Sequence, residues 1–117
     1  AVQGKGAISI IEELMPVPNK FSTSKKLNYI YARTGYTGED GIEIMLEQKD
    51  TINFIHQLET RGVKPCGLGS RDTLRLEASL PLYGFELSDN ISPVEAGLKW
   101  TLSIMMIIWV KILLMNN

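Results

Sequence analysis

The stretch ARTGYTGEDGIEIML, residues 32–46, places three glycines and three acidic residues at the junction of two segments of alternating apolar side chains. Residues 27–34 and 41–47 alternate in the way that is typical of half-buried strands, which predicts an antiparallel hairpin. Glycine adopts a positive φ without strain and lets another backbone or a ligand come close. An ordinary glycine-rich turn and a ligand-binding loop both fit this composition.

Helices are predicted on both sides of the hairpin. Residues 6–15 carry apolar positions at helical spacing and end at a proline. Asp50 is the expected N-cap of a helix that ends at Gly62, and Ser70 is the expected N-cap of a helix over 71–79. The first of these two helices is expected to bury an apolar stripe made of Ile52, Ile55, Leu58 and, more loosely, Phe54.

The order of the predicted elements indicates the fold class. Residues 17–26 are mostly polar and predict a connector without regular structure between the first helix and the hairpin. The order helix, two strands, helix, short extended piece and helix is typical of an α+β fold, in which helices flank an antiparallel sheet. It does not fit the alternation of strands and helices that builds a doubly wound parallel sheet.

Composition and charge narrow the class of partner. Twelve Lys and Arg against thirteen Asp and Glu leave a net charge of −1, so the sequence offers no basis for binding nucleic acid or an anionic membrane. The apolar run 102–115 contains Lys111 and is too short to span a bilayer. The single Cys66 excludes an internal disulfide, and we expect it to be buried or half-buried in an intracellular protein.

Few side chains suggest chemistry on their own. Glu43 lies on the strand face opposite Ile42. From the sequence it is either a side chain that faces solvent or one that binds a ligand. Arg71 and Arg75 share one helix face, most simply a solvated one beside Asp72 and Glu77. His56 has no second His or Cys at metal-ligand spacing, so we expect no metal site. The sequence GLGSRD, residues 67–72, lacks the Lys of a phosphate-binding P-loop and the third Gly of a dinucleotide fingerprint.

Three longer stretches point to a family. RTGYTGEDGIEI (33–44), PCGLGSRDTLRLEASLPLYGFEL (65–87) and ISPVEAGLKW (91–100) together resemble the aminomethyltransferase of the glycine cleavage system, the T-protein. AVQGKGA at the start is similar to a further stretch of that family. The resemblance implies that residues 1–103 are an internal fragment, part of a folate-binding aminomethyltransferase domain.

The resemblance also implies an activity and two site residues. Members of the family take the aminomethyl group from the lipoylated H-protein, release ammonia and pass the one-carbon unit to tetrahydrofolate, their co-substrate, without a metal. Glu43 and Arg71 match folate-binding residues of the family, whereas its catalytic Asp belongs to a segment outside this chain. The implied compartment is the cytoplasm in a bacterium and the mitochondrial matrix in a eukaryote, and we expect no targeting segment within these residues.

Residues 104–117 depart from the family pattern. The apolar sequence that begins at Met105 can be encoded by bases which, read one position earlier, give Asp-Asp-Tyr-Leu-Gly-Lys, the motif that the family has here. We therefore interpret the tail as a frameshifted translation, a hypothesis that the nucleotide sequence decides. Two other functions stay open for the whole chain: a folate-binding relative without catalysis, and an inactive product of a broken gene.

Overall fold

The computed structural model describes residues 1–26 and 28–102 of the 117-residue chain. Residues 1–80 form one compact unit, and residues 81–102 are the described part of a second. In the part of the chain that the structure describes, no helix is both long enough and apolar enough to cross a membrane. The expectations for residues 104–117 lie outside the described residues.

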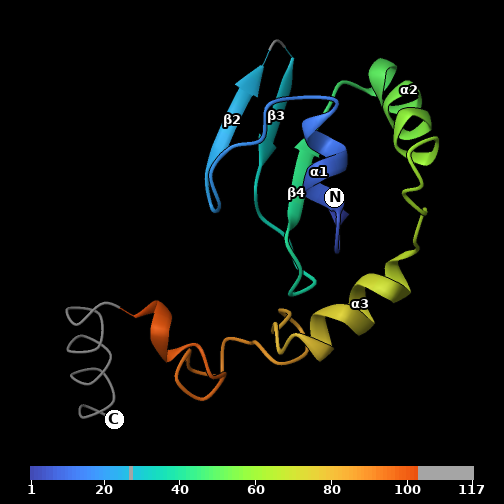
Figure 1. The fold of residues 1–117 in the computed structure, drawn as a ribbon. Helices are drawn as coiled ribbons and strands as arrows, with labels where there is room; N and C mark the ends of the chain where they lie inside the picture. The colour runs from blue at the N-terminus through green and yellow to red at the C-terminus, as the bar shows by residue number, and fades with distance from the viewer. Residues whose placement is uncertain (27, 103–117) are drawn as a thin grey trace. The chain divides into compact units, whose positions relative to one another are not determined.

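An antiparallel sheet of four strands organises the first unit (Figure 1). The strands are β1 (Val2–Gln3), β2 (Thr23–Lys26), β3 (Tyr29–Ala32) and β4 (Gly41–Met45), in the spatial order β1-β4-β3-β2. The predicted hairpin is confirmed as the pair β3 and β4, with Ala32 opposite Glu43. The α+β class with an antiparallel sheet and flanking helices is therefore confirmed.

The expectation that residues 17–26 form an irregular connector is wrong, because β2 lies within it. β2 is an edge strand that pairs with β3 alone, and it has no buried side chain. A strand that buries neither face has no alternation of apolar and polar residues, so its sequence does not indicate a strand. β1 has only two residues and was missed for lack of length.

Three α-helices accompany the sheet: α1 (Ala7–Glu12), α2 (Gln48–Glu59) and α3 (Leu68–Glu77). Gly62 ends α2 as predicted, with a φ of 84°. The amide of Gly62 donates to the carbonyl of Glu59 and that of Val63 to the carbonyl of Leu58, the two bonds of a Schellman motif.

Both predicted N-caps are wrong. Asp50 lies in the first turn of α2, because that helix begins two residues earlier, at Gln48. Ser70 lies inside α3, which begins at Leu68 after Gly67. An acidic residue near a helix N-terminus is favoured by the helix dipole as well as by capping, so composition alone does not separate these positions.

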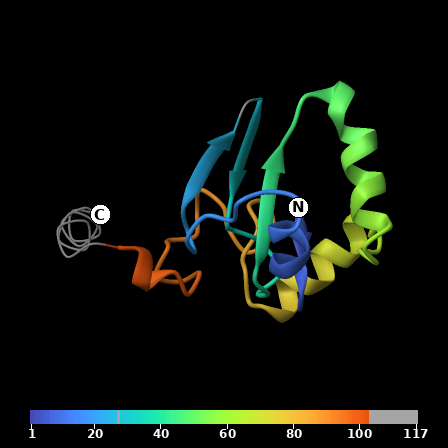
Figure 2. The same cartoon turned by 45° about the horizontal axis from the view of Figure 1, so that its top comes forward.

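The core of the first unit lies between the sheet, α1 and α2. α1 lies against β1 and β4 (Figure 2). The buried apolar side chains are those of Val2, Ala7, Ile11, Met15, Tyr31, Ile42, Phe54 and Leu58. The stripe predicted for α2 is only partly correct, because Phe54 and Leu58 are buried while Ile52 and Ile55 are exposed. Phe54 and Leu58 are four residues apart, so they lie on the same face of the helix, and this is the face that is buried.

The second unit is described over residues 81–102. Its regular structure in this range is an isolated bridge between Tyr83 and Leu87 and a 3₁₀ turn, η1 (Lys99–Thr101). Ser92 and Glu95 form a reciprocal pair, in which the Ser92 amide donates to the Glu95 carboxylate at 2.8 Å and the Glu95 amide donates to the Ser92 hydroxyl at 3.3 Å. The hydrogen bonds from Ser92 lower the pKa of the Glu95 carboxyl.

Candidate functional site

Residues 33–40 connect β3 to β4, and together with Gly41, the first residue of β4, they are called the glycine loop. Gln3 lies opposite Gly41 in the β1–β4 pair. A Cβ atom at Gly41 would overlap the carbonyl oxygen of Val2, and one at Gly35 would overlap the side-chain amide of Gln3. Gly38 has a φ of 77°, which favours glycine, and faces the side chain of Ala78. Glycine is therefore required at position 41 by a backbone contact and favoured at position 38 by a left-handed conformation, whereas the contact at Gly35 is with the flexible end of a side chain.

An ion pair closes the base of the glycine loop. The guanidinium of Arg33 donates to both carboxylate oxygens of Asp40, with N–O distances of 3.2 and 2.8 Å, and the amide of Gly41 donates to the same carboxylate at 3.0 Å. These hydrogen bonds, above all that from Arg33, lower the pKa of Asp40, and the pair raises the pKa of Arg33. Asp40 thus fixes the turn rather than facing a ligand.

Glu43 lies on β4, on the face opposite the buried Ile42, as the alternation predicted. Its side chain is exposed, and its carboxylate accepts a hydrogen bond of 2.6 Å from the hydroxyl of Thr34. Ala32 pairs directly with Glu43, so Thr34, two residues further on, is a diagonal neighbour on the same face of the hairpin. The strand register therefore explains why this hydroxyl reaches this carboxylate.

Arg71 lies in the first turns of α3 and is exposed. Its guanidinium stacks over the ring of Tyr36 in the glycine loop, 4.7 Å from the ring centroid, which is a cation–π contact. In the described structure Arg71 forms no ion pair with Glu43. The aromatic ring, rather than a carboxylate, holds the guanidinium.

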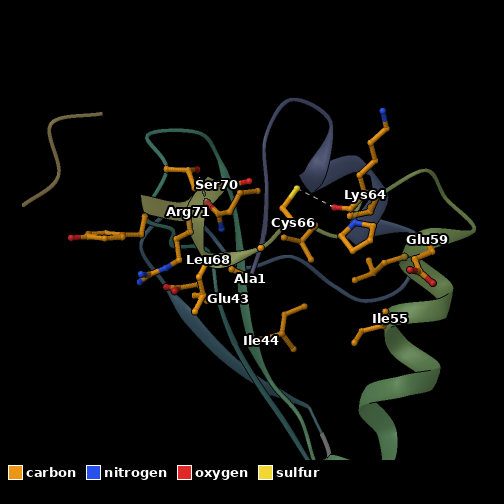
Figure 3. Close-up of a pocket in the computed structure, with 18 of the residues that line it drawn as sticks. Ala1, Glu43, Ile44, Ile55, Glu59, Lys64, Cys66, Leu68, Ser70 and Arg71 are labelled. Atoms are coloured by element: carbon orange, nitrogen blue, oxygen red, sulfur yellow. Dashed lines mark hydrogen bonds between the residues drawn. The ribbon is translucent and has the colours of Figure 1, made fainter. Parts of the chain in front are cut away.

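Glu43 and Arg71 line one cavity of about 580 Å³. They lie toward the same end of it, whereas Lys64 and Glu59 lie toward the other end (Figure 3). Most of the cavity wall is apolar and includes Ile44, Leu46, Phe54, Ile55, Leu58, Val63, Leu68 and Leu74. Ligand sites are commonly apolar cavities of this size with a few polar groups that fix orientation.

The amino-acid patterns of this unit match a known family. The family model described as GCVT N-terminal domain matches residues 1–106. The chain belongs to this family. An aminomethyltransferase from Chromobacterium violaceum is 46% identical over 110 residues, which cover 88% of this chain and 30% of the relative. One from Xylella fastidiosa is 58% identical over 80 residues, which cover 68% of this chain and 22% of the relative.

A solved structure has the same fold. The glycine cleavage system aminomethyltransferase T from Bartonella henselae superposes with a TM-score of 0.75 at 29% identity, over 87% of this chain and 29% of its own length. The resemblance inferred from the sequence motifs is thereby confirmed. This GCVT-family chain spans about a third or less of the length of the curated relatives named above.

Two sequence-based expectations about single residues in this GCVT-family chain are wrong. Arg75 is almost fully buried, at 1% exposure, and does not lie on a solvated face. It donates to the carboxylate of Asp72 at 2.8 Å and to the carbonyl of Leu80 at 3.3 Å. Cys66 is exposed, not buried, and its thiol contacts the carbonyl of Lys64. Within the described residues no group of three or more His, Cys, Asp and Glu is placed to hold a metal ion.

Sequence reasoning missed the residues that hold the two predicted site residues. Thr34 holds Glu43, and Tyr36 holds Arg71. The alternation of the hairpin could have identified Thr34, because strand pairing around the loop places it diagonally from Glu43. No sequence signal links Tyr36 to Arg71, since their contact joins the glycine loop to a helix that begins far along the chain.

Proposed function

We propose that this chain forms part of the tetrahydrofolate site of an aminomethyltransferase of the glycine cleavage system. The whole protein would take the aminomethyl group from the lipoyl arm of the H-protein, release ammonia and form methylenetetrahydrofolate. It would act in the cytoplasm of a bacterium or in the mitochondrial matrix of a eukaryote. The proposal is supported above all by the finding that Glu43 and Arg71 line the same, largely apolar cavity.

Glu43 has the chemistry to bind the pterin edge. A reduced pterin presents a ring N–H and an amino group side by side, and one carboxylate accepts both in a charge-assisted pair. The hydrogen bond from Thr34 to Glu43 Oε2 does not exhaust the carboxylate, because two ionised oxygens offer about four acceptor positions. The exposed carboxylate therefore keeps acceptor positions for a ligand.

Arg71 suits a polar edge or carboxylate of the folate. Arg71 could in principle orient Glu43 or contact the folate directly. The described structure supports the second role, since Thr34 contacts Glu43 and the guanidinium lies on the Tyr36 ring. A guanidinium whose face is stacked on a ring still has its N–H donors in the plane, where they can form a two-pronged contact. The apolar wall of the cavity suits the flat ring faces of the ligand.

Replacement of Glu43 tests this proposal. The variants are made in an aminomethyltransferase of full family length, in which residues 1–102 replace the matching segment of the Chromobacterium violaceum relative. Glu43→Gln removes the charge and one acceptor, so tetrahydrofolate affinity measured by calorimetry should fall about 10- to 150-fold. Arg71→Lys should also weaken binding, because a point charge cannot reproduce a two-pronged contact.

Glu47→Gln is the matched control, because Glu47 is exposed, pairs with Lys49 and does not line the cavity. It should leave the affinity unchanged. Unaltered tetrahydrofolate binding by Glu43→Gln would mean that Glu43 is a solvated strand residue, and the site assignment would then be withdrawn.

The 117-residue chain by itself should show no measurable aminomethyl transfer. Holding two reactants in place supplies much of the rate of such a reaction, and this chain spans about 30% of the length of the Chromobacterium violaceum relative. The check is release of ammonia from aminomethylated H-protein in the presence of tetrahydrofolate. Turnover by the chain alone would show that its own residues suffice for catalysis.

A further inference from the structure

Thr34 lies between Glu43, the proposed folate-binding residue, and Gln3 of the first strand. Its hydroxyl donates to Glu43 Oε2 at 2.6 Å, and its backbone carbonyl accepts a hydrogen bond of 3.1 Å from the side-chain amide of Gln3. Among the described residues, no other side chain donates to the Glu43 carboxylate. One residue thus contacts both the exposed carboxylate and the first strand of the sheet.

We propose that Thr34 is a positioning residue, which holds the carboxylate of Glu43 in the orientation that receives the pterin edge. This inference rests on the proposed function. A glutamate on an exposed strand face has several rotamers, and binding a flat ligand at its carboxylate requires one of them. The short hydrogen bond from Thr34 favours that rotamer before the ligand arrives.

The hydroxyl of Thr34 is well suited to this task because its own position is restricted. Threonine is branched at Cβ and therefore has few χ1 rotamers. Its backbone is held by Gln3, whose side-chain amide also lies 3.5 Å from the carbonyl of Ile42, while Gln3 Oε1 accepts a hydrogen bond of 3.4 Å from the hydroxyl of Thr37. The side chain of Gln3 thus ties together both ends of the glycine loop.

The glycine at position 35 makes this arrangement possible. A Cβ atom there would overlap the Gln3 side-chain amide that binds the Thr34 carbonyl. Arg71 does not replace Thr34 in holding the carboxylate, since its guanidinium lies over Tyr36. The orientation of Glu43 therefore depends on the Thr34 hydroxyl and, behind it, on Gln3.

The test compares Thr34→Val with Thr34→Ser in the full-length chimera described above. Valine keeps the shape of threonine but removes the hydroxyl, so the Kd for tetrahydrofolate should rise about threefold to tenfold, the effect of one hydrogen bond. Serine keeps the hydroxyl and should restore most of the affinity. Thr23→Val, on the exposed edge strand β2, is the matched control and should leave the Kd unchanged.

A double-mutant cycle separates positioning from simple structural support. If Thr34 acts through Glu43, Thr34→Val should change the Kd less than about twofold in the Glu43→Gln background, because the two effects are not additive. A residue that only stabilises the loop would lower the melting temperature and weaken binding equally in both backgrounds. Equal effects in both backgrounds, or no effect of Thr34→Val beside a strong effect of Glu43→Gln, would overturn this inference.

The same measurements keep the two proposals apart. A strong effect of Glu43→Gln with none of Thr34→Val removes the role of Thr34 and leaves the folate site intact. Unchanged binding by Glu43→Gln removes the folate site and, with it, the role of Thr34.

Discussion

The glycine loop and the segment that enters α3, residues 63–72, are both rich in glycine, but the surroundings of these glycines differ. At Gly35 and Gly41 a Cβ atom would overlap atoms of the first strand. At Gly67 and Gly69 it would meet nothing within 4 Å. Glycine therefore lies in tightly packed surroundings in the glycine loop and beside unoccupied space in the segment that enters α3.

The side chains of the two regions also differ in how many contacts hold them. In the glycine loop, Arg33 is paired with Asp40, and the hydroxyl of Thr34 is bonded to Glu43. In the segment that enters α3, Cys66 is exposed and Leu68 is 82% exposed. The loop is held by contacts within this chain, so it can orient ligand groups in advance. The α3 segment contributes Arg71 and the apolar side chains of Val63 and Leu68 to the cavity wall.

Gly41→Ala should produce the largest loss of stability. The added Cβ would overlap the backbone oxygen of Val2, which cannot move without breaking the β1–β4 pair. Overpacking of this kind costs about 1–3 kcal/mol, so the urea midpoint of unfolding of the 117-residue chain should fall clearly.

Gly35→Ala is the informative comparison for Gly41→Ala. Its Cβ would overlap the end of the Gln3 side chain, which can rotate away, so the loss should be smaller. An unchanged midpoint for Gly41→Ala would mean that β1 is not held against β4 as described.

The Arg33–Asp40 pair should make the glycine loop sensitive to acid. Because the folded-state pKa of Asp40 lies below its ordinary value of 3.8, ionised Asp40 stabilises the fold above that pH. The contribution is lost as the pH falls through the lowered folded-state pKa. The pair is partly exposed, with side-chain exposures of 26% and 40%, so its effect should be smaller than that of Gly41→Ala.

Asp40→Asn is the variant that tests this contribution. It should lower the urea midpoint at neutral pH and reduce the further fall that the parent shows once the pH drops below the ordinary pKa of Asp40. Glu39→Gln replaces a neighbouring carboxylate that forms no ion pair in the described structure, so its pH dependence should follow that of the parent. Identical acid profiles for the parent and Asp40→Asn would contradict a stabilising role for the pair.

The sequence predicted those parts of the fold that leave a local pattern. Alternation located β3 and β4 and placed Glu43 on the face opposite Ile42, and Gly62 marked the end of α2. The edge strand β2 was missed because its side chains are not buried and its place is fixed by backbone pairing to β3. Local patterns thus predict elements that bury one face and miss elements held by backbone pairing alone.

The residues that support the site depend on contacts across the chain, which no local pattern contains. Arg75 was expected in solvent because charged residues at helical spacing usually face water, yet it is buried and bound to Asp72 and to a backbone carbonyl. Gln3 is separated from Thr34 by more than thirty positions and still holds its carbonyl. The motifs identified Glu43 and Arg71 as site candidates, and the fold adds what orients them.

Gly69→Ala should have the smallest effect, with the opposite sign. Gly69 lies in the first turn of α3, and an added Cβ would meet nothing within 4 Å. Alanine restricts the unfolded chain more than glycine does and favours helix, so the variant should be more stable by about 0.5–1 kcal/mol in urea unfolding. A loss of stability would show that this segment is as crowded as the glycine loop, and the contrast between the two regions would fail.

If Gly69→Ala stabilises the isolated chain but weakens tetrahydrofolate binding in the full-length chimera, the space at Gly69 is needed for close approach of the ligand or of another part of the enzyme. The glycines of the two regions would then serve two purposes, internal packing in the loop and access at α3.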